Sequence, residues 1–248
     1  MTIQAYLINA ASSKQRLNSS HKNIVEAGLN YERVSAIMGN ELDMPYKNFS
    51  KWSFYLMQGR APTLGEIGCY LSHIKAIKKF LESEYDYGLI LEDDCLIDSN
   101  IKKVIAEAID FGGFDMLRLE TVNTNKYTKS ISISNNYYLG VSYCRQKGAC
   151  GYLINKKDAK KIVNKYLPIK IPYDIRFDLE YLDGFKTLGV TPSPIKQAGL
   201  DTQIQHNIAQ NKFPKYRYFT VLPVRSYFEI SRFFGRLYQH ICLMIRVK

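Results

Sequence analysis

Three consecutive carboxylates, Glu92, Asp93 and Asp94, follow directly on an apolar run in the segment YGLILEDDCLID. The run predicts a buried parallel strand over 87–92 that helices cover on both faces. Adjacent acidic side chains repel one another, and burial raises their pKa values unless a cation offsets the repulsion. Hard divalent ions such as Mg²⁺ and Mn²⁺ prefer oxygen ligands, and ligands of open α/β sheets bind at the carboxyl ends of strands. The segment therefore predicts a metal site at a strand end.

A simpler interpretation of these carboxylates stays open. They could form a solvated turn ahead of a helix that begins at Asp98 or Ser99, because acidic residues favour helix N-termini. The residues alone do not decide between a metal site and a turn.

Strand-like and helix-like segments alternate along the chain, which predicts an α/β fold with a mostly parallel sheet flanked by helices. The expected strands are 3–9, 31–37, 87–92, 114–120 and the start of 150–166, and the expected helices are 12–29, 63–85, 100–112 and the remainder of 150–166. Thr63 and Glu66 form a predicted capping box at the start of the expected helix 63–85. We expect irregular structure over 38–62 and a hairpin or mobile loop over 121–148.

The chain has 248 residues, 46% hydrophobic content and a net charge of +11. Its size and hydrophobic content predict one α/β domain with a small appendage, which we place at 1–211 and 212–248. The charge favours an anionic partner: a nucleotide, a phospholipid surface, an anionic glycan or a nucleic acid.

The appendage is basic, with eight lysines and arginines and one acidic residue. Helical spacing separates its apolar and charged side chains into two stripes. The apolar stripe holds Tyr227, Ile230, Phe234, Leu237 and Ile241, and the charged stripe holds Arg225, Glu229, Arg232, Arg236 and His240. One interpretation is a helix docked on the domain with its arginines in water. The other, which we favour, is an interfacial amphipathic helix whose aromatic face enters lipid headgroups while its arginines meet anionic lipid.

Five cysteines show neither a CxxC pair nor a zinc-like spacing: they are Cys69, Cys95, Cys144, Cys150 and Cys242. Their odd count argues against a complete disulfide framework, so we expect free thiols in a reducing compartment. The N-terminal MTIQAYLINA lacks the features of a secretory signal, and no apolar run reaches the length of about 18 residues that a membrane span needs. These features predict a cytoplasmic protein.

Two segments, TLGEIGCYLSHIKAIKKF and YGLILEDDCLI, resemble the signature pair of glycosyltransferase family 25, which includes lipooligosaccharide galactosyltransferases and collagen-modifying enzymes. Further segments match this family more loosely and in the same order: YLINAASSKQR, VSAIMGNEL, GACGYLINKKDAKKI, IPYDIRFD and TPSPIKQ. The resemblance covers roughly residues 3–197.

The resemblance implies a GT-A-like, Rossmann-related domain that transfers a hexose from a nucleotide donor, usually galactose from UDP-galactose, with inversion. Glu92, Asp93 and Asp94 would then be the counterpart of the family's DxD element and bind the donor, with Asp94 and Glu92 as ligands of Mn²⁺ or Mg²⁺. The cation would stabilise the charge that develops on the departing UDP.

Inverting transfer also requires a base that takes the proton of the acceptor hydroxyl. Asp174 matches a Pro-x-Asp element of the family and is our first candidate, and Asp178 is the second; Glu180 and Asp183 lie nearby in sequence. The alternative is a solvated acidic helix face. His206 would be a late metal ligand or, on the simpler interpretation, a surface histidine.

The nucleotide would lie at the loop after the first strand, where Asn9 and Arg16 match the family and Arg16 is a candidate diphosphate contact. This loop departs from the family, because NAAS stands where Leu-Asp/Lys-Arg-Ser is usual, so the uridine contacts stay undefined. Glu66, Ser72 and His73 belong to the best-matching motif, and we expect them at the donor site. Glu66 could instead only cap its helix, and His73 could be a hydrogen-bonded histidine at the core edge.

The sequence therefore favours a membrane-peripheral glycosyltransferase that binds a UDP-sugar and extends a lipid-linked glycan, such as lipooligosaccharide, on the cytoplasmic side of a membrane. Two other classes stay open. One is a metal-dependent sugar-nucleotide hydrolase, although we find no nucleophile motif. The other is a nucleic-acid-binding protein, for which KFPKYRYF offers aromatic and basic side chains. We expect no nucleic-acid partner, because most of the excess charge lies in the appendage.

Overall fold

The computed structural model describes residues 1–248 except 44–45, 121–126, 135, 199–214 and 248. An eight-stranded sheet crosses the molecule in the order β2-β1-β3-β8-β5-β9-β7-β6. Its strands are β1 (Ile3–Asn9), β2 (Tyr31–Ser35), β3 (Tyr87–Glu92), β5 (Met116–Arg118), β6 (Ile131–Ser132), β7 (Tyr138–Gly140), β8 (Gly151–Asn155) and β9 (Thr187–Thr191). A second, two-stranded sheet pairs β4 (Cys95–Ile97) with β10 (Ile195–Gln197).

The pairing pattern sets the direction of each strand. β1 is parallel to β2 and β3, β8 is antiparallel to β3 and β5, β9 is parallel to β5, and β7 is antiparallel to β9 and β6. β7 and β8 therefore run against the other described strands of this sheet, which is mostly parallel. The predicted α/β class is confirmed.

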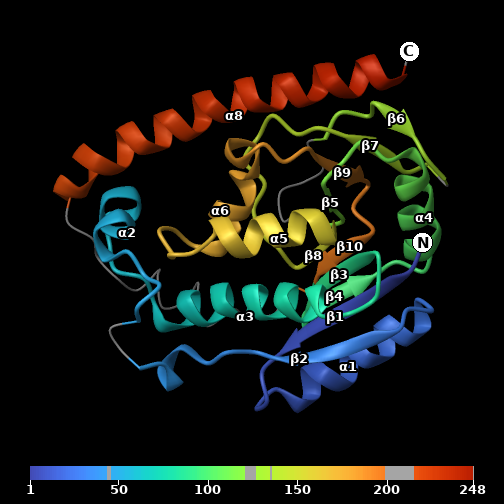
Figure 1. The fold of residues 1–248 in the computed structure, drawn as a ribbon, viewed down its shortest axis with the longest axis horizontal. Coiled ribbons are helices and arrows are strands. Elements are labelled where there is room, and N and C mark those ends of the chain that lie inside the picture. The colour runs from blue at the N-terminus through green and yellow to red at the C-terminus, as the bar shows by residue number, and fades with distance from the viewer. Residues whose placement is uncertain (44–45, 121–126, 135, 199–214, 248) are drawn as a thin grey trace.

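Helices cover both faces of the central strands (Figure 1). They are α1 (Lys14–Glu26), α2 (Lys51–Gln58), α3 (Leu64–Leu81), α4 (Ile101–Phe111), α5 (Lys156–Lys165), α6 (Tyr173–Asp178) and α8 (Tyr218–Val247), with short 3₁₀ turns η1 (Gly39–Glu41), η2 (Glu180–Asp183) and η3 (Lys215–Arg217). Side chains alternate across a strand, so Leu7 and Leu91 join the core under α1 and α4, whereas Tyr6 and Ile90 join the core under α3 and α5.

The elements with the clearest local signals match the prediction. β1 has the predicted bounds, β3 begins and ends as expected, and the described part of 121–148 contains the β6–β7 hairpin. The capping box is present: Thr63 Oγ1 accepts the Glu66 N–H at 3.2 Å, and a Glu66 carboxylate oxygen accepts the Thr63 N–H at 2.8 Å.

The prediction of irregular structure over 38–62 is wrong in part, because α2 forms there. Its eight residues give too short a pattern for helical periodicity to be evident. The helix is held by tertiary packing instead, since Phe54 is buried and stacks at a tilt on Phe49, 5.8 Å between ring centroids.

The long helix α8, drawn in red in Figure 1, crosses the width of the molecule and packs on α2 and η2. Its arginines face inward: Arg232 is 1% exposed and Arg236 is 2% exposed. Its aromatic stripe faces outward, with Tyr227 57% and Phe234 63% exposed. Both sequence interpretations placed these arginines in water or against lipid, and for Arg232 and Arg236 both are wrong.

Buried acids explain this reversal. Asp178 is fully buried and accepts from Arg232, with Nη2 at 2.9 Å and Nε at 3.0 Å. Arg236 pairs with the equally buried Glu180 and lies 3.9 Å from Asp178. Each buried charge thus has an opposite partner, which offsets its loss of hydration.

The expectation of five free thiols is also wrong. Cys95 and Cys150 form a disulfide between β4 and the start of β8, whereas Cys69, Cys144 and Cys242 are free. The two partners lie 55 positions apart in the sequence, so their proximity depends on the tertiary structure. Among the described residues, no helix combines the length and the apolar character that crossing a bilayer requires.

Candidate active site

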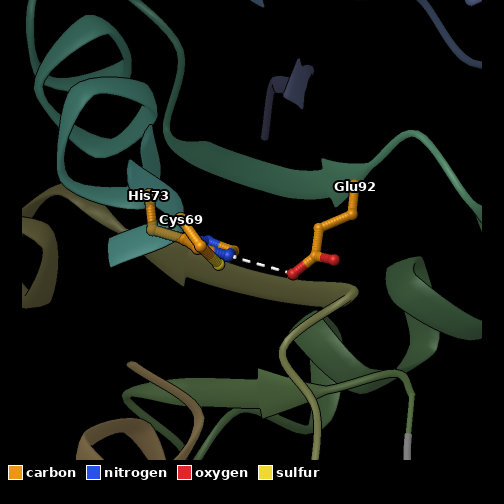
Figure 2. A group of neighbouring side chains, drawn as sticks. All are labelled: Cys69, His73 and Glu92. Carbon is orange, nitrogen blue, oxygen red and sulfur yellow. Dashed lines mark hydrogen bonds and ion pairs between the residues drawn. The ribbon is translucent and has the colours of Figure 1, made fainter. Parts of the chain in front are cut away.

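The three consecutive carboxylates do not share one side of the sheet: Glu92, the last residue of β3, faces α3, whereas Asp93 and Asp94 in the turn after it line a cleft beside α1. Glu92 ends β3 on the face that α3 covers. Its Oε1 faces His73 Nε2 (Figure 2). These two atoms lie 3.1 Å apart, and the Glu92 side chain is 29% exposed. Glu92 and His73 were both predicted at the site, and the structure brings them into direct contact.

Asp93 turns toward α1 on the other face. Its Oδ2 accepts from Asn9 Nδ2 at 2.7 Å, and its Oδ1 lies 3.5 Å from Arg16 Nη1. Asn9 is almost fully buried, and its Oδ1 accepts from Arg33 at 3.1 Å. Asn9 therefore positions Asp93, while Arg16, whose side chain is 35% exposed, keeps an accessible guanidinium beside it.

Asp94 lies in the turn between β3 and β4, and it is 5% exposed. Its Oδ2 accepts from Gln197 Nε2 at 2.8 Å. Burial, and then the neighbouring carboxylates of Glu92 and Asp93, raise the pKa of Asp94 above its usual value. A bound cation would offset the repulsion between these carboxylates.

A cleft of about 420 Å³ opens between α1 and the β3–β4 turn. Arg16 and Ser20 line it from α1, Asp93 and Asp94 line it from the turn, and Ala198 closes it after β10. Its volume falls in the range of small-molecule sites, about 300–1,000 Å³. The cleft holds two carboxylates and a guanidinium at the carboxyl ends of the parallel strands, where ligands of open α/β sheets bind.

Glu120 is a further buried carboxylate near this edge, and it was not among the predicted site residues. It is 3% exposed, and its backbone pairs with Ile195 of β10. Burial raises its pKa to about 7, an effect that Arg118 opposes and that Glu92 and Asp94 increase. The sequence did indicate this residue as a site candidate, because Glu120 is the last residue of the predicted strand 114–120, just as Glu92 is the last residue of the predicted strand 87–92.

We expect Glu120→Gln to flatten the pH dependence of stability. The folded pKa of about 7 lies above that of an unfolded glutamate, so the stability that the protonated group contributes is complete at acid pH and is lost as the pH rises through about 7. Urea unfolding in EDTA between about pH 4 and pH 8 should show wild type losing on the order of 2–3 kcal/mol more than Glu120→Gln. The exposed Glu84→Gln is the control, and equal losses in Glu120→Gln and wild type would contradict the assignment.

Two residues of the best-matching motif have structural partners. Ser72 Oγ donates to the Gly68 carbonyl at 2.7 Å and accepts the Ile37 N–H at 2.8 Å, which ties α3 to the chain after β2. Glu66, besides closing the capping box, accepts from Arg60 Nη1 at 2.7 Å. Both side chains are buried, so the structure gives them a role in placing α3.

The two candidate bases differ in access. Asp174 lies in the first turn of α6, its side chain is 39% exposed, and it lies 3.6 Å from Arg145. Burial raises the pKa of Asp174, and Arg145 opposes the rise. Asp178 has no comparable access, because it is fully buried against Arg232 and also accepts the Gln146 N–H at 2.9 Å. We therefore retain Asp174 alone; His206 lies outside the described residues.

Cys69 is a site neighbour that our sequence analysis treated only as an inert thiol. Figure 2 shows its side chain beside His73, both projecting from α3 toward Glu92. Burial, and then the carboxylates of Glu92 and Asp174, raise the pKa of this thiol well above its usual range. The sequence feature that could have identified Cys69 is its position four residues before His73, because this spacing places both side chains on one face of the predicted helix.

Comparison with known proteins matches residues 2–177 to the family described as "Glycosyltransferase family 25 (LPS biosynthesis protein)". A "Glycosyltransferase 25 family member" of Aedes aegypti is 27% identical over 180 residues, 68% of this chain and 29% of the relative. A "Putative glycosyltransferase" of Haemophilus influenzae is 26% identical, covering 75% of this chain and 67% of the relative. The "Lipooligosaccharide biosynthesis protein lex-1" of the same species is 30% identical, covering 47% and 41%. The chain spans less than a third of the Aedes relative.

Solved structures show weaker likeness. TarS 1–349 of S. aureus has a TM-score of 0.49 at 11% identity, covering 97% of this chain and 72% of that chain. The galactosyltransferase LgtC, solved with donor and acceptor sugar analogues, has a TM-score of 0.43 at 12% identity, covering 88% and 99%. Both scores lie below 0.5.

Proposed function

This chain belongs to glycosyltransferase family 25, and we propose that it transfers galactose from UDP-galactose to a lipid-linked glycan with inversion at the sugar. The observation that carries the proposal is the cleft of about 420 Å³, in which Asp93, Asp94 and Arg16 meet at the carboxyl ends of β1 and β3. Two acids and one guanidinium suit a nucleotide diphosphate bound together with a divalent cation.

The residues fit a hard cation such as Mn²⁺ or Mg²⁺. Asp94 is buried beside Glu92 and Asp93, and burial together with these two carboxylates raises its pKa, so a bound cation would offset an unfavourable charge there. Asp94 and Glu92 would hold the ion, with Glu92 using Oε2 because its Oε1 faces His73. When bound, the ion supplies positive charge that stabilises the departing diphosphate.

The protein's own groups would do the rest. Arg16 would contact the diphosphate, and Asn9 would hold Asp93 in place beside it. The acceptor oxygen attacks the anomeric carbon, the bond from that carbon to the phosphate oxygen breaks, and the hydroxyl proton passes to Asp174. Its raised pKa makes Asp174 a stronger base than an ordinary aspartate. Its side chain is also partly exposed, so an acceptor hydroxyl can reach it.

Calorimetric titration tests the donor. UDP-galactose, UDP-glucose and GDP-mannose are each titrated with Mn²⁺ and with EDTA, and we expect Mn²⁺-dependent binding of UDP-galactose alone. Preferential binding of another nucleotide sugar would assign that sugar as the donor, and binding of none of the three would overturn the proposal. Donor cleavage without transfer to any added glycan would favour the hydrolase instead.

We also propose that α8 holds the enzyme on the cytoplasmic face of a membrane. Its outward side carries a continuous apolar face, each member at least half exposed: Tyr227, Ile230, Phe233, Phe234, Tyr238, Ile241 and Ile245. An exposed apolar face of this length marks an interaction surface. The net charge of +11 favours an anionic bilayer, although the buried Arg232 and Arg236 leave most of the contact to the apolar side chains.

The double variant Ile230→Ser/Phe234→Ser should reduce flotation with phosphatidylglycerol-containing vesicles by about tenfold or more, since each buried apolar side chain contributes about 1.5–3 kcal/mol. Tyr85→Ser, a change of an exposed aromatic residue before β3, should leave flotation unchanged. Equal flotation of the double variant and wild type would exclude α8 as the membrane contact.

A further inference from the structure

Cys69, His73 and Glu92 bring three different ligand groups together at the end of β3. Cys69 and His73 lie one helical turn apart on α3, so both side chains leave the same face. Their sulfur and imidazole nitrogen, together with a Glu92 oxygen, all lie within 4.8 Å of one another. Figure 2 shows the three groups converging from two elements.

This spacing is close to that of a tetrahedral metal site. Zn²⁺ binds sulfur at about 2.3 Å and imidazole nitrogen at about 2.0–2.1 Å, which puts neighbouring ligand atoms roughly 3.3–3.7 Å apart. His73 Nε2 and Glu92 Oε1 are already 3.1 Å apart. The three ligand atoms, none more than 4.8 Å from another, are therefore close to the spacing of such a site.

The imidazole is also fixed as a metal ligand usually is. A ligating histidine commonly uses its second ring nitrogen in a hydrogen bond that sets its orientation and tautomer. His73 Nδ1 lies 3.2 Å from the Tyr152 hydroxyl, and that hydroxyl lies 2.8 Å from the Tyr173 hydroxyl. The Tyr173 ring stacks on the imidazole, 4.1 Å between centroids and 5° from parallel. The buried ring is thus locked with Nε2 toward Glu92.

We propose that Cys69, His73 and Glu92 bind a thiophilic divalent ion of the Zn²⁺ type on the α3 side of Glu92, where Oε1 faces His73, next to the diphosphate site that would use Oε2 of the same carboxylate. A thiolate and an imidazole select Zn²⁺ over the hard ions Mg²⁺ and Mn²⁺. Three protein ligands leave the fourth position free, and the partial exposure of Glu92 opens that position to water or to an oxygen of a bound sugar. The Cys69 proton passes to solvent as the thiolate binds.

Co²⁺ substitution tests the site without an activity assay. Protein freed of metal by EDTA is titrated with Co²⁺ in the absence of reductant, so that the Cys95–Cys150 disulfide stays intact. We expect a near-ultraviolet sulfur-to-cobalt absorption band that one equivalent of Zn²⁺ abolishes and that excess Mg²⁺ leaves in place. Cys69→Ser should lose the band, and Cys144→Ser, which changes an exposed free thiol elsewhere, should keep it.

A second variant keeps the test informative if Cys69→Ser folds poorly. Tyr152→Phe leaves all three ligands and removes only the hydroxyl at His73 Nδ1, so it should weaken Zn²⁺ binding by about 10–100-fold. Absence of the band, its persistence in Cys69→Ser, or unchanged affinity in Tyr152→Phe would overturn the proposal. None of these readouts depends on donor binding, so the galactosyltransferase proposal and this one can fail separately.

Discussion

Asp94→Asn should abolish Mn²⁺-dependent binding of UDP-galactose and lower the rate of transfer by at least about a hundredfold. The amide has nearly the shape of the carboxylate and keeps the hydrogen bond to Gln197 within reach, but it removes the negative charge that would bind the cation. Losing one group that stabilises developing charge costs about 10²–10³ in kcat in other enzymes.

The measurement combines calorimetry with kinetics on the same preparations. Asp98→Asn is the matched control, because it makes the same chemical change on an exposed side chain four positions along. Circular dichroism should be alike in both variants and wild type. If Asp94→Asn retained Mn²⁺-dependent binding, the cation would have to be held by other acids of this edge, and Glu120→Gln would be the next variant to measure.

Arg236→Met should lower the free energy of unfolding by about 3–5 kcal/mol, because it leaves a buried carboxylate without its partner. The carboxylate is Glu180, which is fully buried and whose pKa burial raises against the opposing charge of Arg236. Without Arg236 the pKa of Glu180 should rise further. The loss should therefore be smallest at acid pH, where Glu180 is protonated, and should grow as the pH rises.

Urea unfolding followed by circular dichroism measures this loss. Arg225→Met removes the same charge from an exposed position of the same helix and should change stability little. Adding Glu180→Gln to Arg236→Met should recover a large part of the loss, since it removes the unpaired charge. A loss in Arg236→Met no larger than that in Arg225→Met would show that the pair does not hold α8 on the domain.

Local patterns predicted the elements that local forces determine. β3 and α3 were predicted because an apolar run and a helical repeat with a capping box are complete within their own segments. The metal-site hypothesis rested on three adjacent acids, yet strand alternation sends Glu92 and Asp93 to opposite faces. Adjacency in sequence thus indicated the right edge of the sheet, but not which side chains share a cavity.

The errors concern contacts between distant segments. A helical wheel shows that α8 has two faces but not which face packs inward, and here the deciding partners, Asp178 and Glu180, lie about fifty residues earlier. The Cys95–Cys150 bond and the approach of Glu120 to Glu92 likewise depend on the order of strands in the sheet. That order is not encoded in any single segment.

The placement of β8 between β3 and β5 also bears on how the chain folds during synthesis. β1, β2 and β3 are complete early and pair with one another, but the far edge of β3 has no partner until residue 155 has emerged. Until then β3 is an exposed edge strand of high apolar content, the kind of edge that pairs with other chains. Insertion of β8 requires closure of a long loop and is expected to be the slow step of folding. The nascent protein is therefore most prone to aggregate just before β8 pairs with β3.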